Sequence, residues 1–138
     1  TYVQGDGCSL NYDNQSFDVA FSNSVIEHVR DWQSQKRFAE EIRRVGKSLW
    51  VQTPARCFPV EPHLLAFFAH WFPNTIRKPL LRWLSLRRFI DLSAAGCDSL
   101  ADEIRLLTFS EMKELFHDCE IYIERFLGIP KSYIAIRK

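Results

Sequence analysis

The chain has 138 residues, the size of one domain or of part of one. Hydrophobic residues make up 46% and charged residues 25%, which supplies a packed core and excludes a disordered tail. With 18 Lys and Arg against 17 Asp and Glu, the net charge is +1, which excludes nonspecific electrostatic binding of nucleic acid as the main activity.

The first third of the chain predicts strands around one helix. Extended runs at Tyr2 to Gln4, Phe17 to Ser22 and Ser48 to Gln52 each predict a strand. Between the last two we expect a helix with Ser34 as its N-cap and Gly46 as a C′ residue. The order strand, helix, strand predicts a parallel pair with a right-handed crossover.

The helical pattern also predicts which residues are buried and which pair on the surface. The buried face is expected to carry Phe38, Ala39, Ile42 and Val45. Glu40 and Arg44 lie four residues apart, so we expect them to interact on the exposed face.

The second half of the chain changes character after the third strand. Ala55 to Leu107 is rich in Pro, Phe, Trp and Leu and predicts a mostly helical insertion. Thr108 opens a capping box before a short helix. Two strands follow, Ile121 to Phe126 and Ser132 to Arg137, and their short link favours an antiparallel hairpin.

The four cysteines are widely separated and show no zinc-ligand spacing, so we interpret them as reduced thiols. No secretory signal opens the sequence, and the longest apolar stretch is far shorter than the ~18 residues of a bilayer span. The sequence therefore predicts a cytoplasmic protein.

Several short motifs follow one another over the first 54 residues. They are Gly5-Asp6-Gly7, Ser16-Phe17-Asp18-Val19-Ala20-Phe21-Ser22, Val25-Ile26-Glu27-His28-Val29, Arg44-Val45 and Thr53-Pro54. None is specific alone, but in this order and spacing they resemble the type 11 group of class I S-adenosylmethionine-dependent methyltransferases.

The resemblance implies an α/β fold, a Rossmann-like seven-stranded sheet with a reversed last strand. It assigns residues 1–54 to strands three to five, 55–107 to a helical lid, and 108–138 to the terminal helix and antiparallel strand pair. The glycine-rich turn and the ribose-binding acid of the family do not occur in the sequence. We therefore expect the chain to be the C-terminal portion of a methyltransferase, with an open apolar sheet edge and weak cofactor binding.

The resemblance also implies a cofactor, S-adenosyl-L-methionine, and residues that contact it. Asp6 occupies the place of the acid that approaches the adenine amino group, with the Gly7 and Cys8 backbone beside the ring. The alternative is that Asp6 forms a turn with its glycines. Small polar side chains after the second predicted strand would line the methionine end of the cofactor, or form a strand exit and helix N-cap; they are Ser22, Asn23 and Ser24.

Glu27 and His28 are expected at the cleft or its rim. A neutral histidine could remove a proton from an acceptor hydroxyl or amine. The alternative, which we favour, is a structural pair that holds the loop. A related group of RNA methyltransferases binds a metal through a similar pair and a glutamate three residues earlier; Ser24 stands in that place here, so we expect no metal.

A second polar cluster follows the third predicted strand and should lie over the same strand ends. Arg56, Glu61 and His63 are candidates for contact with the acceptor substrate, or for tethering the loop to the domain. The segment 76–90 is cationic and aromatic, so contact with the inner membrane surface is an alternative to a solvated lid.

The predicted activity is methyl transfer to a small-molecule or lipid- or glycan-linked acceptor, with no nucleic-acid partner. The alternatives are a non-catalytic interaction module that keeps the fold, and a peripheral membrane protein that uses the basic segment. The sequence does not indicate the oligomeric state.

Overall fold

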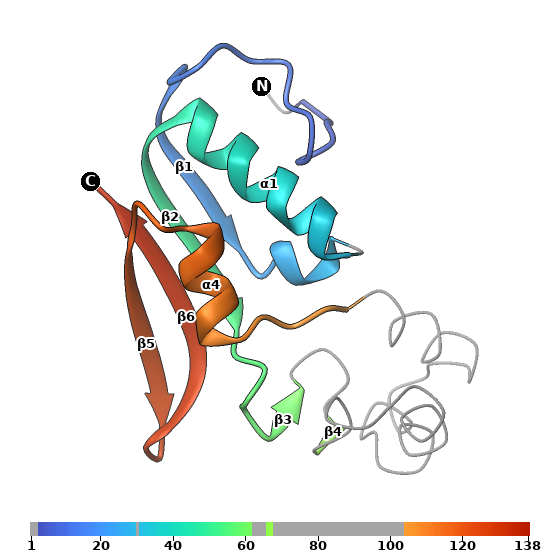
Figure 1. Cartoon of the computed structure of the whole chain (residues 1–138), viewed down its shortest axis with the longest axis vertical. Helices are drawn as coiled ribbons and strands as arrows, with labels where there is room; N and C mark the ends of the chain where they lie inside the picture. The colour runs from blue at the N-terminus through green and yellow to red at the C-terminus, as the bar shows by residue number, and fades with distance from the viewer. Residues whose placement is uncertain (1–2, 30, 62–65, 68–103) are drawn as a thin grey trace, which may run out of the picture.

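The computed structural model of the chain describes residues 3–29, 31–61, 66–67 and 104–138. Figure 1 shows their centre, a four-stranded sheet in the order β1-β2-β6-β5. The elements are β1 (Phe17–Asn23), η1 (Ile26–His28), α1 (Trp32–Val45), β2 (Gly46–Pro54), β3 (Val60–Glu61), β4 (Ala66–Phe67), α4 (Phe109–Leu115), β5 (Glu120–Phe126) and β6 (Ile129–Arg137).

The strand directions confirm the predicted fold. β1 and β2 are parallel neighbours, with Ala20 opposite Leu49, and α1 forms the crossover between them. β6 runs antiparallel to both β2 and β5, so the last strand is the reversed one. The carboxyl ends of β1, β2 and β5 therefore lie at the same edge of the sheet.

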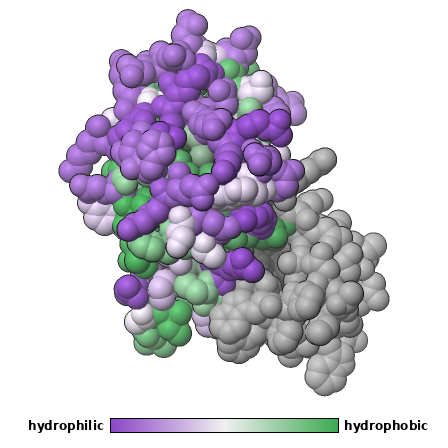
Figure 2. Space-filling model, in the orientation of Figure 1, coloured by the Kyte–Doolittle hydropathy of each residue, from purple (hydrophilic) through white to green (hydrophobic). Residues whose placement is uncertain are grey.

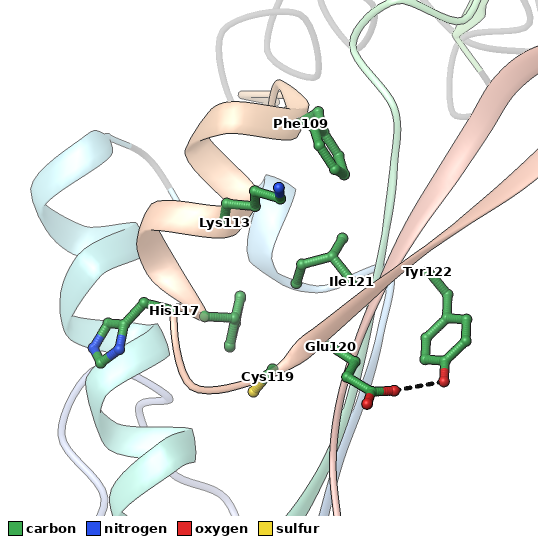
Figure 3. A pocket seen from close by; sticks show the side chains of 8 residues that line it. Phe109, Lys113, His117, Cys119, Glu120, Ile121 and Tyr122 are labelled. Atoms are coloured by element: carbon green, nitrogen blue, oxygen red, sulfur yellow. Dashed lines mark hydrogen bonds between the residues drawn. The ribbon is translucent and has the colours of Figure 1, made fainter.

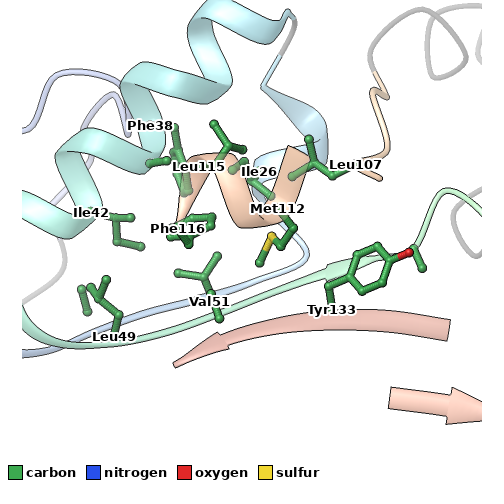
Figure 4. Close-up of a cluster of buried hydrophobic side chains, with 14 residues drawn as sticks. Ile26, Phe38, Ile42, Leu49, Val51, Leu107, Met112, Leu115, Phe116 and Tyr133 are labelled. Atoms are coloured by element: carbon green, nitrogen blue, oxygen red, sulfur yellow. The ribbon is translucent and has the colours of Figure 1, made fainter. Parts of the chain in front are cut away.

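The hydrophobic core lies between the helices and one face of the sheet. Figure 1 shows α1 and α4 on this same face, and Figure 4 shows the side chains between them and the strands. The fully buried members of this core include Phe116, Met112, Leu107, Val51 and Ala135.

Three details of α1 differ from the prediction. Asp31, not Ser34, is the N-cap, and its side chain accepts a hydrogen bond from the Ser34 amide at 2.8 Å. Gly46 follows the helix in an extended conformation (φ −92°) and begins β2, so it is not a left-handed C′ residue. Arg44 pairs with Glu41 rather than with Glu40.

The N-terminal segment lies along α1 instead of joining the sheet. The strand predicted for Tyr2 to Gln4 is wrong for the residues described, because Val3 and Gln4 belong to no strand. Glu41 accepts hydrogen bonds from Arg44 and from the Leu10 amide, and these lower the pKa of Glu41 to about 2. Arg44 also donates to the Leu10 carbonyl, which ties the segment to the helix.

The insertion predicted for Ala55 to Leu107 falls mostly outside the described residues. Its two ends meet, because Ala55 and Leu107 form a parallel bridge beside the carboxyl end of β2. Near its start the described backbone forms a short antiparallel pair, β3 and β4, rather than a helix.

The other face of the sheet carries exposed apolar side chains. Val19 is 61% and Phe21 67% exposed, and the Phe21 ring stacks on Trp50 at 4.7 Å between centroids. Among the described residues β1 pairs with β2 alone, so its second edge is open. In the described part of the chain an unpaired strand edge therefore lies beside an exposed apolar face of the sheet.

A charged cluster just after α4 is expected to contribute to the loss of folding stability at low pH. Burial opposes ionisation of Asp118, but hydrogen bonds from Arg43 at 2.7 Å and Arg137 at 2.6 Å outweigh it and lower its pKa from 3.8 to about 2. A depressed carboxyl pKa contributes stability above pH ~4 that is lost as the pH falls towards 2. We expect Asp118→Asn to be less stable than wild type at pH 7 and less sensitive to pH between 4 and 2.

Urea unfolding at several pH values checks this expectation. Asp18→Asn is the control, because its salt bridge to Lys47 is exposed. Equal losses of stability in wild type and Asp118→Asn between pH 4 and 2 would contradict the assignment.

Candidate functional site

A pocket of about 480 Å³ opens just beyond the carboxyl end of β1, where parallel α/β sheets bind their ligands. Three segments form it: the N-terminal loop, η1 with its flanking residues, and the first turns of α1. Its lining residues are Asp6, Gly7, Cys8, Ser9, Val25, His28, Val29, Ser34, Arg37 and Phe38. The volume lies within the ~300–1,000 Å³ range of small-molecule sites.

The loop at Asp6 is a tight turn whose side chain also faces the pocket. The Asp6 carboxylate accepts a hydrogen bond from the Cys8 amide at 2.9 Å, and the Asp6 carbonyl accepts from the Ser9 amide at 3.0 Å. A Cβ atom on Gly7 would lie 2.9 Å from the Phe38 ring, so glycine lets the loop lie close against α1. The turn is therefore present, and it places a carboxylate at the pocket wall.

The pocket contains charges of both signs. Burial raises the pKa of the Cys8 thiol, the Asp6 carboxylate raises it further, and Arg37 partly opposes both. Arg37 is exposed and donates to the Ser34 hydroxyl at 3.1 Å. An acid and a guanidinium thus flank an uncharged thiol over an apolar floor.

Glu27 does not face the cleft, contrary to the prediction. Its side chain is 0% exposed, and its carboxylate accepts a hydrogen bond from the Thr53 hydroxyl at 2.9 Å. The Glu27 carbonyl accepts from the Arg105 amide at 2.8 Å. Glu27 therefore holds η1 to β2 and to the end of the insertion, while the exposed His28 lies at the pocket.

A buried glutamine fixes the position of η1. Gln35 of α1 is 0% exposed and donates from Nε2 to the carbonyls of Ile26 and Arg105, both at 2.9 Å. Arg105 donates back to Gln35 Oε1 at 2.6 Å, and it also forms a salt bridge with Glu111. This network sets the pocket wall formed by η1.

The three small polar residues at the end of β1 lie outside the pocket lining. Ser22 is buried on the helix side of the sheet, and its hydroxyl has no partner among the described residues. Asn23 is the exposed last residue of β1. Ser24 has a positive φ of 52°, and both its amide and its hydroxyl donate to Gln52, at 3.1 Å each. Ser24 thus joins the ends of β1 and β2.

The second predicted cluster is described only in part. The Arg56 amide donates to the Leu107 carbonyl at 3.0 Å, and its side chain is exposed. Glu61 lies in β3. His63 lies outside the described residues, so the structure does not bring these three side chains together.

A larger hollow of about 640 Å³ lies beside α4 at the beginning of β5 (Figure 3). Its wall includes Cys119, whose thiol pKa burial raises to about 11, which makes it a poor nucleophile at neutral pH. Because β5 begins here, the hollow lies away from the carboxyl ends of the parallel strands. We therefore assign the candidate site to the smaller pocket.

The described residues include neither a candidate metal cluster nor a candidate membrane-spanning helix. No group of three or more His, Cys, Asp or Glu side chains there could hold a metal ion. No helix in this part of the chain is long and apolar enough to cross a membrane.

Sequence reasoning missed the contribution of α1 to the pocket. Arg37 follows Ser34 by one helical turn, and the helix places both beside Asp6. The sequence pattern of an amphipathic helix does not distinguish exposed residues that line a pocket from exposed residues that face solvent. The role of α1 becomes clear only from the position of the N-terminal loop.

Comparisons with known proteins concern the family and the fold of the chain. A family model described as a methyltransferase domain matches residues 1–49. This match agrees with the resemblance of the sequence motifs to the class I S-adenosylmethionine-dependent methyltransferases. No curated protein matches the sequence.

Two solved structures resemble this chain. A SAM-dependent methyltransferase from Methanosarcina mazei is 17% identical, with a TM-score of 0.49, over 96% of this chain and 63% of its own. A protein from Nostoc punctiforme assigned as an O-methyltransferase is 11% identical, with a TM-score of 0.50, over 98% of this chain and 35% of its own. At 11% identity the likeness to the second protein shows the fold alone. This chain spans less than two thirds of either protein.

The pocket suits the adenosine end of the cofactor of this family, S-adenosyl-L-methionine. The Asp6 carboxylate can accept a hydrogen bond from the exocyclic amine of adenine, and the loop backbone of Gly7 and Cys8 lies beside it. Phe38 and Val29 supply an apolar floor for a planar ring. These residues would hold the nucleoside, while the described part of the chain offers no comparable set for the ribose.

Proposed function

We propose that this methyltransferase chain contributes the adenine-binding wall of the cofactor site and transfers a methyl group to a small-molecule or lipid- or glycan-linked acceptor. The observation that supports this proposal most strongly is the position of Asp6 in a ligand-sized pocket beyond the carboxyl end of β1. The parallel β1–β2 pair at this edge supports the proposal, because such sheets bind ligands there.

The bound cofactor would supply an electrophilic methyl group on a sulfonium. Asp6 orients the nucleoside, and positioning of this kind provides most of the rate in a displacement. His28, exposed at the pocket, would take the proton that the acceptor loses.

We propose that these 138 residues alone bind the cofactor weakly. The sequence contains no G-x-G-x-G turn, and the pocket has one acidic side chain facing the nucleoside. Calorimetry with S-adenosylhomocysteine is expected to give no micromolar binding. A micromolar dissociation constant would contradict weak binding and leave the family assignment intact.

Asp6→Asn tests the adenine contact directly. Asparagine can keep the turn, since its side-chain oxygen also accepts from a backbone amide. It removes the negative charge that the adenine amine would meet, so we expect affinity for S-adenosylhomocysteine to fall about tenfold, which is roughly 1.4 kcal/mol. NMR titration measures dissociation constants in the millimolar range.

The matched control is Asp13→Asn, an exposed loop aspartate outside the pocket. Its affinity should equal that of wild type. Equal affinities for wild type and Asp6→Asn would show that Asp6 only forms the turn.

A further inference from the structure

The turn between β5 and β6 ends in exposed apolar side chains. Phe126 is 57%, Leu127 87% and Ile129 42% exposed, and we call these three residues the hairpin tip. Figure 2 shows hydrophobic atoms gathered where Figure 1 places this turn, below a largely hydrophilic upper part. Contiguous exposed apolar residues of this kind commonly mark an interaction surface.

The backbone conformation of the turn is unfavourable for a leucine at position 127. Phe126 pairs with Ile129, so the loop has two residues, Leu127 (φ 49°) and Gly128 (φ 82°). Two-residue hairpin loops with positive φ at both positions favour Asn-Gly, because asparagine tolerates this region better than leucine. An exposed leucine in a disfavoured conformation stabilises neither the core nor the turn, which points to a role in binding.

Positive charge surrounds the hairpin tip. Residues 55–59 and 124–132 include the exposed cations Arg56, Arg125 and Lys131 and one acid, Glu124. Contacts place these two segments together: the Ala55 amide donates to the Lys131 carbonyl at 2.9 Å, and the rings of Phe58 and Phe126 are 6.4 Å apart. These two segments together therefore carry a net positive charge.

The contacts of the two hairpin cations fix them close to the tip. Arg125 donates to the Gly128 carbonyl at 3.0 Å, across the turn. Lys131 pairs with Glu124 at 2.7 Å in an exposed salt bridge, which contributes little and can be exchanged for another anion.

We propose that the hairpin tip inserts into the surface of an anionic lipid bilayer, with Arg125 and Lys131 at the level of the lipid phosphates. Apolar side chains ahead of basic ones are the pattern of a protein that binds at a membrane interface. A second copy of the chain fits less well, since two cationic tips would repel each other. The tip lies at the carboxyl end of β5, the same edge of the sheet as the candidate site, but the proposal does not depend on that site's activity.

Leu127→Asn is the decisive variant because asparagine is favoured at this positive φ. It should fold at least as well as wild type while it removes the most exposed apolar side chain. Co-sedimentation of the full chain with vesicles of phosphatidylcholine and phosphatidylserine is expected to show at least a tenfold lower partition coefficient for Leu127→Asn. Wild type should also bind pure phosphatidylcholine vesicles less, and Arg125→Gln should reduce the difference between the two lipids.

Val3→Asn and Phe21→Ser are the matched controls, because both replace exposed apolar residues elsewhere on the surface. Each should bind vesicles as strongly as wild type does, after the amount of protein that sediments without lipid is subtracted. Wild-type partition of Leu127→Asn would overturn the proposal. So would loss of binding in Phe21→Ser alone, which would identify the sheet face as the surface. A concentration-dependent dimer abolished by Leu127→Asn, without vesicle binding by wild type, would identify a second copy as the partner.

Discussion

Replacement of Gln35 by leucine is expected to lower the free energy of unfolding by about 3 kcal/mol. Leucine matches the side chain roughly in size, so the loss comes from hydrogen bonds rather than from a cavity. The carbonyls of Ile26 and Arg105 each lose a donor at 2.9 Å, and the Arg105 guanidinium loses one of its acceptors at 2.6 Å and keeps Glu111. Buried polar groups left without partners each contribute a penalty of about 1–3 kcal/mol.

Gln33→Leu is the matched control on the same helix. Gln33 is exposed, so its replacement should change stability by no more than about 0.5 kcal/mol. Urea unfolding measures both variants. Equal stabilities for Gln35→Leu and wild type would show that the network does not hold η1 against α1.

Gly46→Ala is expected to destabilise the chain by about 1–3 kcal/mol, the usual cost of overpacking. A Cβ atom at Gly46 would lie 2.6 Å from the Ala20 Cβ and 2.9 Å from the Ser48 carbonyl oxygen. The backbone oxygen cannot move without displacing β2. The φ of −92° suits any residue, so lack of space rather than conformation requires glycine here.

Gly5→Ala provides the opposite case, since nothing lies within 4 Å of a Cβ atom at that position. Its stability should equal or slightly exceed that of wild type, because alanine restricts the unfolded chain. Thermal unfolding distinguishes the two variants. A stabilised Gly46→Ala would contradict the close contact between β1 and the start of β2.

The sheet could be predicted because local pattern and topology agree. The apolar alternation of Phe17 to Ser22, the capping box at Thr108 and the closing hairpin are all confirmed. The pairing of Glu41 with Arg44 could not be foreseen, because both Glu40 and Glu41 lie within reach on a helix. The contact of Glu41 with the Leu10 amide, a residue distant in sequence, favours one of them.

The candidate site could be predicted only in outline. The resemblance pointed to Asp6 and His28, and both line the pocket. Glu27, adjacent to His28, faces the protein interior because η1 turns it towards Thr53, an orientation that three residues of sequence do not specify. Arg37 reaches the pocket through tertiary packing of the N-terminal loop on α1, which has no local signature.

The central claim is that the pocket beyond β1 binds the adenosine end of S-adenosylmethionine. Two-dimensional amide NMR of the full chain during titration with S-adenosylhomocysteine tests it most directly. We expect saturable shifts concentrated at Asp6 to Ser9, Val25, Val29 and Arg37. Shifts confined to the hollow beside α4, or no shifts at millimolar ligand, would contradict it.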